Sequence, residues 1–459
     1  MKVANKKVTA ERLVRDALEK AKYFSDYHIF TFLNEEVAIK KAKEIDKRIA
    51  KGEKVGKLAG VPYALKDNFL SPEGETTASA HILEGFTAPV TATAVAKLEA
   101  EGAIMIGRTN LDAFAHGSTT ENSYFGPTLN SHDKTRVAGG SSGGSAVAVA
   151  LDIVEFATGT DTGGSIRQPA SFNGVYGLKP TFGTVSRYGV VAMASSTDCI
   201  GFFTKTPDDM NLLMSIAAGQ DPKDMTTLPD YYDESETKSQ KDSLRIGVIK
   251  EFDNDSVSPE IREALKKKVE LLKAKGHEIV EVKMPSLKYA LAAYYIIVPA
   301  EVASNLSRHD GVRYGFRSDK SADLKNLYEN TRNEGFMPEN KRRIMIGNFV
   351  LSSGFYDAYF LKAAKARTLI VKEYEKAFSK CDFLLAPVTP NPAFKLGEKI
   401  GDPVAMYLED MMTVSLNLAG VPGLTIPAGE TKEGIALGLQ LIGPRQSDKN
   451  LIQFAKELA

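Results

Sequence analysis

The sequence has no excess of charge of either sign. Its 459 residues include 58 Lys and Arg and 58 Asp and Glu, so the formal net charge is zero. A protein that binds nucleic acid through its own surface usually has an excess of Lys and Arg or a stripe of them on one face. Neither is visible here, so any nucleic acid that this protein serves is expected to be held by something else.

Cysteine and long apolar runs are scarce as well. The two cysteines, Cys199 and Cys381, are too few for a disulfide framework or a four-thiolate zinc site. Met1 to Lys7 lead into a polar helix pattern, not into the apolar core of a signal peptide. No window reaches the roughly 18 uninterrupted apolar residues of a membrane span. We therefore expect reduced thiols and a soluble, cytoplasmic protein without membrane contact.

Motifs for phosphate and metal binding are missing too. A Walker A loop needs Gly-Lys-Ser/Thr after its glycines, and none occurs. There is no His-Glu-x-x-His or Cys-x-x-Cys, and the six histidines are not grouped at ligand spacing. The sequence therefore predicts no metal site and no nucleotide site in this chain.

Helix and strand patterns alternate in the first part of the chain. Apolar residues at helical spacing predict helices over 13–21, with Thr9 as N-cap, and over 38–49, with Gly52 as the stop. Apolar runs at 61–65, ending at Lys66, and at 103–106 predict strands, with a helix near 93–100 between them. This alternation indicates an α/β protein.

The second part of the chain is expected to complete the same sheet. Residues 220–242 are polar and predict a surface loop or linker. Strands are predicted at 244–249, 383–386, 424–426 and 435–442, a helix at Ser258-Pro259, and mostly helix over 287–380. We therefore predict one domain over 1–459 with a mixed central β-sheet covered by helices on both faces. Its parts are N-terminal helices at 1–60, a core at 61–205 and the remainder at 243–459.

Two glycine-rich segments stand out. The run 139–145 precedes an apolar helix from Ala146, and the run 158–165 follows a strand-like stretch at 153–157. The first run twice matches the Gly-x-Ser-x-Gly nucleophile elbow of α/β-hydrolases. That elbow needs a strand directly before it, whereas residues 130–136 read as a loop, so we do not assign it.

A lysine at a strand end and serines among glycines can together make a nucleophile. A serine hydroxyl reacts only when a base takes its proton. Lysine can be that base only when neutral, which requires burial or a nearby like charge. Glycines let backbone N–H groups crowd around a reacting carbonyl. Taken alone, each feature also fits a surface lysine or an ordinary Gly-Ser turn.

Taken in this order, the segments 66–68, 139–145 and 159–169 resemble the amidase signature family. The resemblance extends over nearly the whole chain and implies the single α/β domain predicted above, with 61–205 as its signature core. It implies a Ser–Ser–Lys triad, with Ser165 as nucleophile, Ser141 as proton shuttle and Lys66 as base. It also implies a cis peptide bond between Gly140 and Ser141.

The same resemblance assigns supporting roles around the triad. Backbone N–H groups of residues 162–165 would form the oxyanion hole, and two charged side chains would support that loop from behind. The oxyanion-hole residues are Thr162, Gly163, Gly164 and Ser165, and the supporting residues are Asp161 and Arg167.

Within the family, segments 305–315, 341–359 and 417–423 resemble the glutamine-hydrolysing subunits of tRNA-dependent amidotransferases. This resemblance implies that the chain releases ammonia from glutamine and binds no cofactor itself. It implies a heterotrimer with two other subunits, one of which would use ATP with Mg²⁺ to amidate Glu-tRNA(Gln). The tRNA would be reached through those partners, which fits the neutral net charge.

A glutamine pocket must meet an α-carboxylate and an α-ammonium group. An Arg fork suits the first and a carboxylate the second. By resemblance, Arg343 and Asp410 take these roles, and Tyr294 forms part of the wall. Arg343 lies in a Lys-Arg-Arg run that also fits a solvated helix face, and Tyr294 lies among apolar residues that also fit a core.

Three residues depart from the pattern, and two other functions stay open. Thr197, Cys199 and Phe202 stand where such subunits usually show Leu, Gln and Pro. The alternatives are a stand-alone amidase acting on small carboxamides and a catalytically idle scaffold. Glutaminases with a cysteine nucleophile are excluded, because residue 2 is Lys and neither cysteine lies in a glycine-rich elbow.

Overall fold

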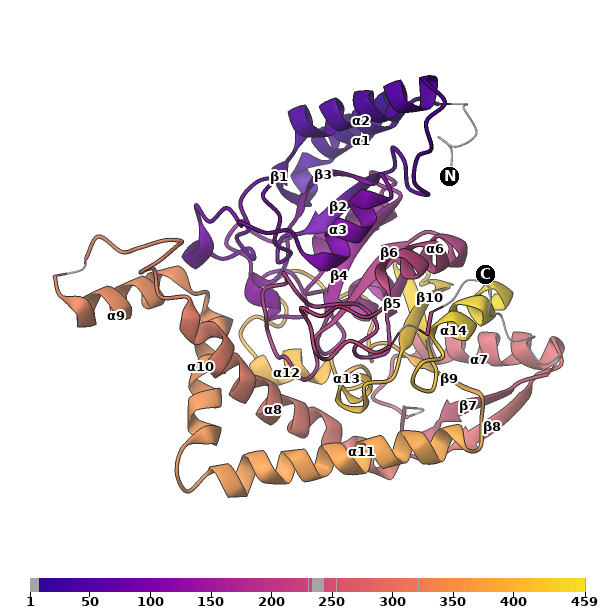
Figure 1. Cartoon of the computed structure of the whole chain (residues 1–459). Coiled ribbons are helices and arrows are strands. Elements are labelled where there is room, and N and C mark those ends of the chain that lie inside the picture. The colour runs from indigo at the N-terminus through magenta and orange to yellow at the C-terminus, as the bar shows by residue number, and fades with distance from the viewer. Residues whose placement is uncertain (1–7, 230, 233–242, 253, 321, 459) are drawn as a thin grey trace.

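The computed structural model describes residues 8–229, 231–232, 243–252, 254–320 and 322–458 (Figure 1). Within these residues one sheet of 11 strands has the order β1-β3-β2-β4-β6-β5-β10-β11-β9-β7-β8. The strands are β1 Phe30–Leu33, β2 Pro62–Lys66, β3 Ile104–Thr109, β4 Phe156–Asp161, β5 Tyr176–Lys179, β6 Cys199–Thr204, β7 Arg245–Ile249, β8 Glu278–Val282, β9 Phe383–Pro387, β10 Gly423–Glu430 and β11 Ala436–Ile442.

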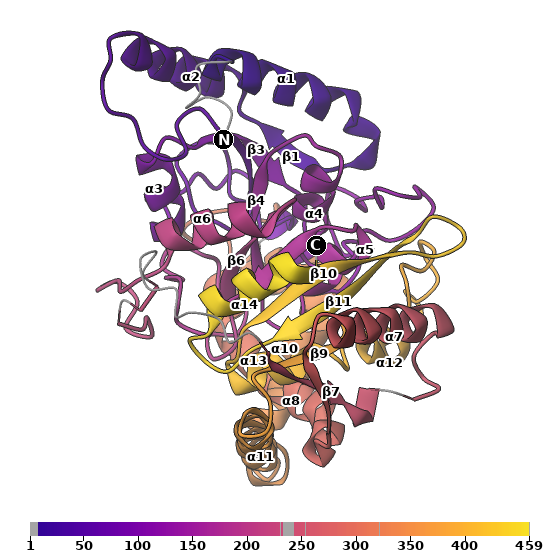
Figure 2. The ribbon, with the colours of Figure 1, turned by 90° about the vertical axis from the view of Figure 1, so that its right-hand side faces the viewer.

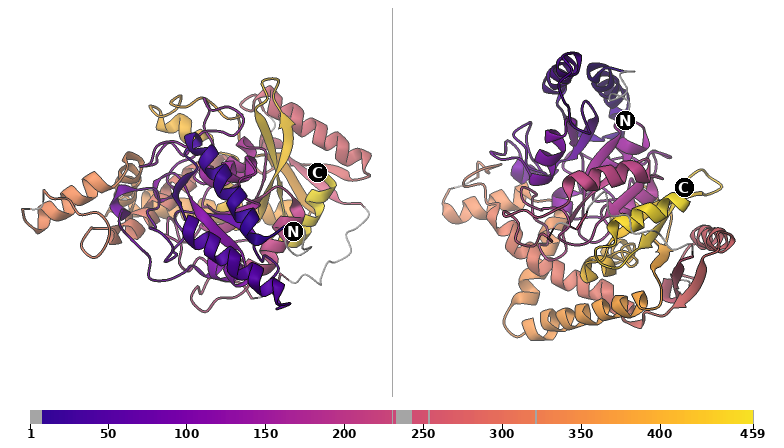
Figure 3. Two further views of the ribbon diagram at one scale, coloured as in Figure 1. Left: turned by 90° about the horizontal axis from the view of Figure 1, so that it is seen from above. Right: turned by 45° about the vertical axis from the view of Figure 1, so that its right-hand side comes forward.

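Helices account for most of the remaining regular structure. In chain order they are α1 Ala10–Tyr23, α2 Glu35–Ala50, α3 Thr93–Ala100, α4 Gly143–Ala150, α5 Arg167–Phe172, α6 Pro207–Ala217, α7 Pro259–Ala274, α8 Ala290–Asn305, α9 Leu324–Gly335, α10 Pro338–Leu351, α11 Lys362–Phe378, α12 Pro403–Leu408, α13 Val414–Ala419 and α14 Asp448–Ala455. The predicted helical stretch over 287–380 thus holds α8 to α11. Helix α9 projects from the body on the side away from α7 (Figures 1 and 3).

The sheet joins the two ends of the chain. Strands β1 to β6 form one half and β7 to β11 the other, and they meet where β5 pairs with β10, with Gly423 opposite Lys179. Strand β2 is parallel to β3 and β4, whereas β4–β6, β5–β10 and β10–β11 are antiparallel. The predicted mixed sheet built from both ends of the chain is confirmed.

Both faces of the sheet are buried under helices, because side chains alternate along each strand. In β2, Tyr63 and Leu65 belong to a core shared with α3 and α6, whereas Ala64 belongs to a second core with α1, α2 and α4. Helices α1 and α2 lie over the edge that carries β1 and β3 (Figure 2). The predicted coverage of both faces is therefore confirmed.

The N-terminal helices are fixed to each other at the start of α1. The hydroxyl of Thr9 accepts a hydrogen bond from the amide of Arg12, as predicted for an N-cap. The carboxylate of Asp46 in α2 accepts from the amides of Ala10 (2.7 Å) and Glu11 (2.9 Å). These bonds satisfy donors that the first turn of a helix leaves free.

Strand β4 differs from the prediction. The strand expected at 153–157 begins at Phe156 and runs on to Asp161, so residues 158–161 are strand and not turn. The reason is pairing, because each residue of β4 is matched by one of β6, ending with Asp161 opposite Cys199. Strands β1, β5, β6 and β8 were not predicted from the sequence. Two of the departures, Cys199 and Phe202, are buried in β6.

The predicted surface loop or linker begins as a packed loop. Asp221 accepts hydrogen bonds from the hydroxyls of Thr93 and Ser186, each at 2.6 Å, and Asp224 forms an ion pair with Arg187 at 3.1 Å. Residues 230 and 233–242 of that prediction lie outside the described part of the chain. Among the described helices, none combines the length and the apolar character that a membrane crossing requires.

The start of α7 gives a test of the local fold. The hydroxyl of Ser258 accepts from the amide of Ile261, and Pro259 occupies the first helical position, as predicted. Loss of such a cap costs about 1 kcal/mol. We expect Ser258→Ala to lower the free energy of unfolding by that amount in urea denaturation. Ser353→Ala, at an exposed residue between two helices, is the control and should cause no measurable loss.

Candidate active site

The side chain of Lys66 is buried among hydroxyl groups. Lys66 is the last residue of β2, and its Nζ lies 2.9 Å from Ser141 Oγ, 2.7 Å from Ser142 Oγ and 2.8 Å from Thr160 Oγ1. Its exposed fraction is 0%. Burial lowers the pKa of Lys66 to about 7, although nearby carboxylates, first of them Asp112, act to raise it. A neutral amine is therefore accessible near neutral pH, as the predicted base requires.

The turn that brings Ser141 to Lys66 requires glycine at positions 139 and 140. Gly139 has a φ of +77°, in the region that favours glycine. A Cβ on Gly140 would lie 2.1 Å from a carboxylate oxygen of Asp112. The peptide bond between Gly140 and Ser141 is cis, as the family resemblance implied. Helix α4 begins two residues after Ser141, earlier than the predicted start at Ala146.

Ser165 lies between β4 and α5, next to the Ser141 segment. The amide of Ser142 donates to the carbonyl of Ser165 at 3.2 Å, which joins the two segments. Ser165 is 8% exposed, whereas Ser141 and Lys66 are both at 0%. In the described part of the chain the hydroxyl of Ser165 forms no hydrogen bond, so proton transfer between Ser165 and Ser141 stays a prediction.

The loop before Ser165 is held by the carboxylate of Asp161. That carboxylate accepts hydrogen bonds from the amides of Gly164 (2.9 Å), Ile166 (3.1 Å) and Arg167 (3.3 Å). The N–H group of Gly164 is thus engaged by Asp161 in this structure, and its role in the oxyanion hole stays a prediction.

Other amides of the same loop remain for an oxyanion. Those of Thr162, Gly163 and Ser165 donate to no acceptor within the described residues. Of the predicted set, these three can therefore serve a developing negative charge without first breaking a hydrogen bond.

Asp161 and Arg167 form a fully buried ion pair. Arg167 Nη2 lies 3.0 Å from Asp161 Oδ1, and its Nε lies 3.1 Å from Oδ2. Burial alone would raise the pKa of Asp161, but Arg167 holds it well below its usual range. Arg167 also donates to the side chains of Asn417 (2.7 Å) and Gln440 (3.1 Å) and to the carbonyl of Thr413 (3.1 Å). The nucleophile loop is thus bound to the C-terminal part of the chain.

A cavity of about 240 Å³ lies beside the Ser141 segment. Asp112, whose amide donates to the carbonyl of Ser141 at 3.3 Å, forms part of its wall. The lining also includes His116, Ser118, Glu339, Arg343 and Tyr407. The cavity therefore lies between Asp112, which is bonded to the Ser141 segment, and residues of α10.

Arg343 presents a buried cation at this cavity. It is 3% exposed, its Nε donates to Glu339 at 2.8 Å, and its guanidinium lies over the rings of Tyr295 (5.3 Å) and Tyr407 (5.7 Å). Its two terminal nitrogens form no hydrogen bond within the described residues. The alternative of a solvated helix face therefore does not hold for Arg343, although it does for its exposed neighbour Arg342.

Asp410 and Tyr294 approach the same region from other elements. Asp410 accepts hydrogen bonds from Tyr295 Oη (2.7 Å) and Ser118 Oγ (2.8 Å), and burial raises its pKa to about 6. A Cβ on Gly163 would lie 2.4 Å from Tyr294 Oη, so Tyr294 covers the loop that carries the free amides. Tyr295 contacts all three predicted pocket residues. It donates to Asp410, its ring lies under the guanidinium of Arg343, and its ring centroid lies 5.1 Å from that of Tyr294.

Several residues of the site were missed from the sequence. Tyr295 follows Tyr294 directly, and Ser142 follows Ser141, so adjacency was the signal for both. Thr160 lies within the glycine-rich run 158–165, but that run did not mark it as a partner of Lys66. For Asp112 and Ser118 no sequence signal was available, because their positions depend on long-range packing.

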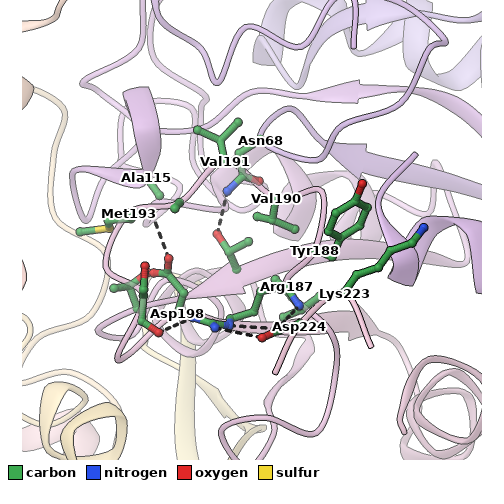
Figure 4. Close-up of a pocket in the computed structure, with 15 residues that line it drawn as sticks. Asn68, Ala115, Arg187, Tyr188, Val190, Val191, Met193, Asp198, Lys223 and Asp224 are labelled. Carbon is green, nitrogen blue, oxygen red and sulfur yellow. Dashed lines mark hydrogen bonds and ion pairs between the residues drawn. The ribbon is translucent and has the colours of Figure 1, made fainter. Parts of the chain in front are cut away.

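A second cavity, of about 200 Å³, lies against Asn68, Thr160 and Thr162 (Figure 4). Thr160 is the residue whose hydroxyl contacts Lys66, so this cavity is one side chain away from Lys66. Hydrogen bonds hold its wall in place, because Asp198 accepts from Thr162 Oγ1 at 2.6 Å and from the amide of Met193 at 3.0 Å. In the part of the chain that the structure describes, no group of three or more His, Cys, Asp or Glu side chains is placed to hold a metal ion.

Comparison with known proteins gives consistent matches over almost the whole chain. The chain is 49% identical over 432 residues to a glutamyl-tRNA(Gln) amidotransferase subunit of Thermosynechococcus vestitus, covering 93% of this chain and 89% of that protein. The crystal structure of a glutamyl-tRNA(Gln) amidotransferase subunit from Thermotoga maritima superposes with a TM-score of 0.80 at 38% identity, covering 98% of this chain and 94% of that one. A solved amidase superposes with a TM-score of 0.84 at 32% identity, covering 99% and 96%.

The family assignment rests on a match of similar extent. Residues 12–452 match the Amidase family, and this range includes the buried lysine, the two glycine-rich serine segments and the pocket residues. Sequence, fold and site geometry lead to the same result, and the chain belongs to the amidase signature family.

Proposed function

We propose that this chain is the glutamine-hydrolysing subunit of a tRNA-dependent amidotransferase, supplying ammonia for the conversion of Glu-tRNA(Gln) to Gln-tRNA(Gln). The observation that carries the proposal is the pairing of a buried lysine–serine centre with a cavity that presents a buried Arg343. The relatives at about 49% identity are named as subunits of glutamyl-tRNA(Gln) amidotransferase, which supports the same function.

The proposed reaction begins with proton removal from Ser165. Neutral Lys66 takes the proton of Ser141, and Ser141 takes that of Ser165, whose oxygen attacks the carboxamide carbon of glutamine. The amides of Thr162, Gly163 and Ser165 stabilise the tetrahedral oxyanion. The proton returns through Ser141 to the leaving nitrogen, which departs as ammonia. Water then hydrolyses the glutamyl ester of Ser165 and releases glutamate.

The proposed glutamine recognition uses opposite charges at two positions. Arg343 has two terminal nitrogens available for the α-carboxylate, and bidentate pairs of this kind are among the strongest hydrogen bonds in proteins. Asp410 is proposed to hold the α-ammonium group, while Ser118 and Tyr295 fix its carboxylate. Tyr294 closes the wall next to Gly163.

The proposal extends to the assembly. Two further subunits would complete a heterotrimer in the cytoplasm, and one of them would bind ATP with Mg²⁺ and amidate the tRNA-linked glutamate. The equal numbers of cationic and anionic residues in this chain support a division of labour in which a partner holds the tRNA.

A stand-alone amidase for small carboxamides is the second candidate. It is favoured by the close superposition on a solved amidase, and it would use the same triad with a pocket that does not need Arg343. An idle scaffold is disfavoured by the contact between Lys66 and Ser141, which a protein without catalysis has no need to keep.

The first test is glutamine-dependent ammonia release by the chain purified together with its partner subunits. We expect Ser165→Ala to lower the rate of ammonia release at least 10³-fold, because it removes the proposed nucleophile. Release should rise with mischarged tRNA and ATP. Ser165-dependent hydrolysis of simple amides by the lone chain, without preference for glutamine, would instead establish the stand-alone amidase.

Replacing Arg343 separates the two candidate enzymes. Arg343→Met leaves the α-carboxylate of glutamine unpaired in a buried site, at a cost of roughly 3–5 kcal/mol. We expect kcat/KM for glutamine to fall about 10²- to 10³-fold, and that for butyramide to change much less. Lys341→Met, on the same helix but away from the cavity, is the matched control. Equal losses with both substrates would contradict the proposed role.

The pH dependence tests the base. Because catalysis needs neutral Lys66 and its pKa is about 7, kcat/KM should fall about tenfold per pH unit below that value. Asp112 attracts the ammonium form and raises this pKa, so Asp112→Asn should move the acid limb of the profile to lower pH. Asp152→Asn, at an exposed site, should leave the profile in place. If the acid limb of the kcat/KM profile stays in place or moves to higher pH in Asp112→Asn, Lys66 is not the titrating base.

A further inference from the structure

An exposed aromatic corner lies where α10 meets α11, at the lower edge of the molecule (Figure 1). The nine consecutive residues 351–359 are all exposed. Among 345–369, eight large apolar side chains are at least 36% exposed, with Met345 reaching 71%. They are Met345, Phe349, Leu351, Phe355, Tyr356, Tyr359, Leu361 and Leu369.

The rings of this corner pack on one another and not into either core. Phe355 lies 4.3 Å from Phe349 and 6.0 Å from Tyr359, and Tyr356 stacks on Phe360 at 5.2 Å. The rings keep a large exposed fraction despite this mutual packing, 47% for Phe349 and 40% for both Phe355 and Tyr359. An ordered apolar surface of this kind on a protein marks a contact with another molecule.

The charges around the corner indicate what covers it. Lys362 and Lys365 are exposed in the first turns of α11, and neither forms an ion pair within the described residues. Asp357 is the acidic residue of the corner itself. Two cations at the border of an apolar surface attract carboxylates on the occupant.

The same two lysines argue against a second copy of this chain. In a twofold contact the corner would face itself, so each copy would bring Lys362 and Lys365 to the contact against a single Asp357. The backbone of 356–361 is helical, so the corner offers no strand edge to which an extended segment could add. Recognition therefore has to occur through side chains.

We propose that the corner formed by residues 345–369 is a docking surface for another subunit of the amidotransferase, which presents an apolar helix face bordered by carboxylates. The identity of the partner rests on the proposed function, whereas the existence of the surface rests on the exposure, ring packing and charge just described. Anchors of this type are aromatic side chains whose removal weakens a complex strongly.

Assembly with the two other subunits tests the proposal. We expect Tyr356→Ser with Tyr359→Ser to weaken association at least 100-fold, and Lys362→Glu with Lys365→Glu at least tenfold with a reduced dependence on salt. The measurements are size-exclusion chromatography with light scattering, and titration of labelled chain into the co-purified partners. Met225→Ser and Leu324→Ser, which alter exposed apolar residues elsewhere, should assemble like the wild type.

Two further readouts separate docking from folding and from the proposed function. The circular dichroism spectrum and the thermal unfolding midpoint of the isolated chain should be unchanged in the corner variants, which shows that they fold. A benzoylphenylalanine at position 356 should crosslink to an acidic helix of a partner subunit. Crosslinking to a second copy, or wild-type assembly by both double variants, overturns the docking surface alone. Failure of the wild type to assemble with those subunits overturns the proposed function instead.

Discussion

A lysine side chain buried among hydroxyl groups is the constraint on which the rest of the site depends. Removing a charged ammonium from water costs several kcal/mol when no carboxylate compensates it. Within the described residues Lys66 has three hydroxyl partners and no directly bound carboxylate, so its neutral form is favoured and its pKa is lowered to about 7. The surrounding residues preserve this balance, because Asp112, Asp161 and Asp198 are near enough to act on the charge but do not pair with it.

The second constraint is the buried contact between Asp161 and Arg167. Asp161 accepts hydrogen bonds from the amides of Gly164 and Ile166. The amides of Thr162, Gly163 and Ser165 remain available to the substrate. Arg167 in turn fixes Asp161 and extends to Asn417 and Gln440. The nucleophile loop is therefore positioned from both halves of the sheet, although all three proposed triad residues come from the first half.

Much of the fold could be predicted from the sequence, and the reasons are local. Thr9 and Ser258 are cap residues with a clear pattern, and β2, β3, β9 and β11 are apolar runs. Strands β5 and β6 were missed because glycine, threonine and cysteine interrupt their apolar character, and only pairing with β4 and β10 makes them strands. The end of β4 was misjudged for the same reason, since a Thr-Gly-Thr-Asp run reads as a turn until β6 lies beside it.

The same distinction between local patterns and long-range contacts decides which parts of the site could be predicted. Lys66, Ser141 and Ser165 could be proposed from motifs, because the chemistry requires those residue types among glycines. The engagement of Gly164 by Asp161 could not, since the direction of an amide depends on the path of the loop. Ser118 could likewise not be identified, because it reaches Asp410 from a segment that is 292 residues away in sequence.

The join between β5 and β10 also has a consequence for biosynthesis. A ribosome that has completed the two glycine-rich serine segments has not yet made Thr413, Asn417 or Gln440, the residues that fix Arg167. The nascent chain therefore carries Ser141 and Ser165 without the contacts that orient the Ser165 loop. That loop takes its final position only late in translation, when the C-terminal strands enter the sheet.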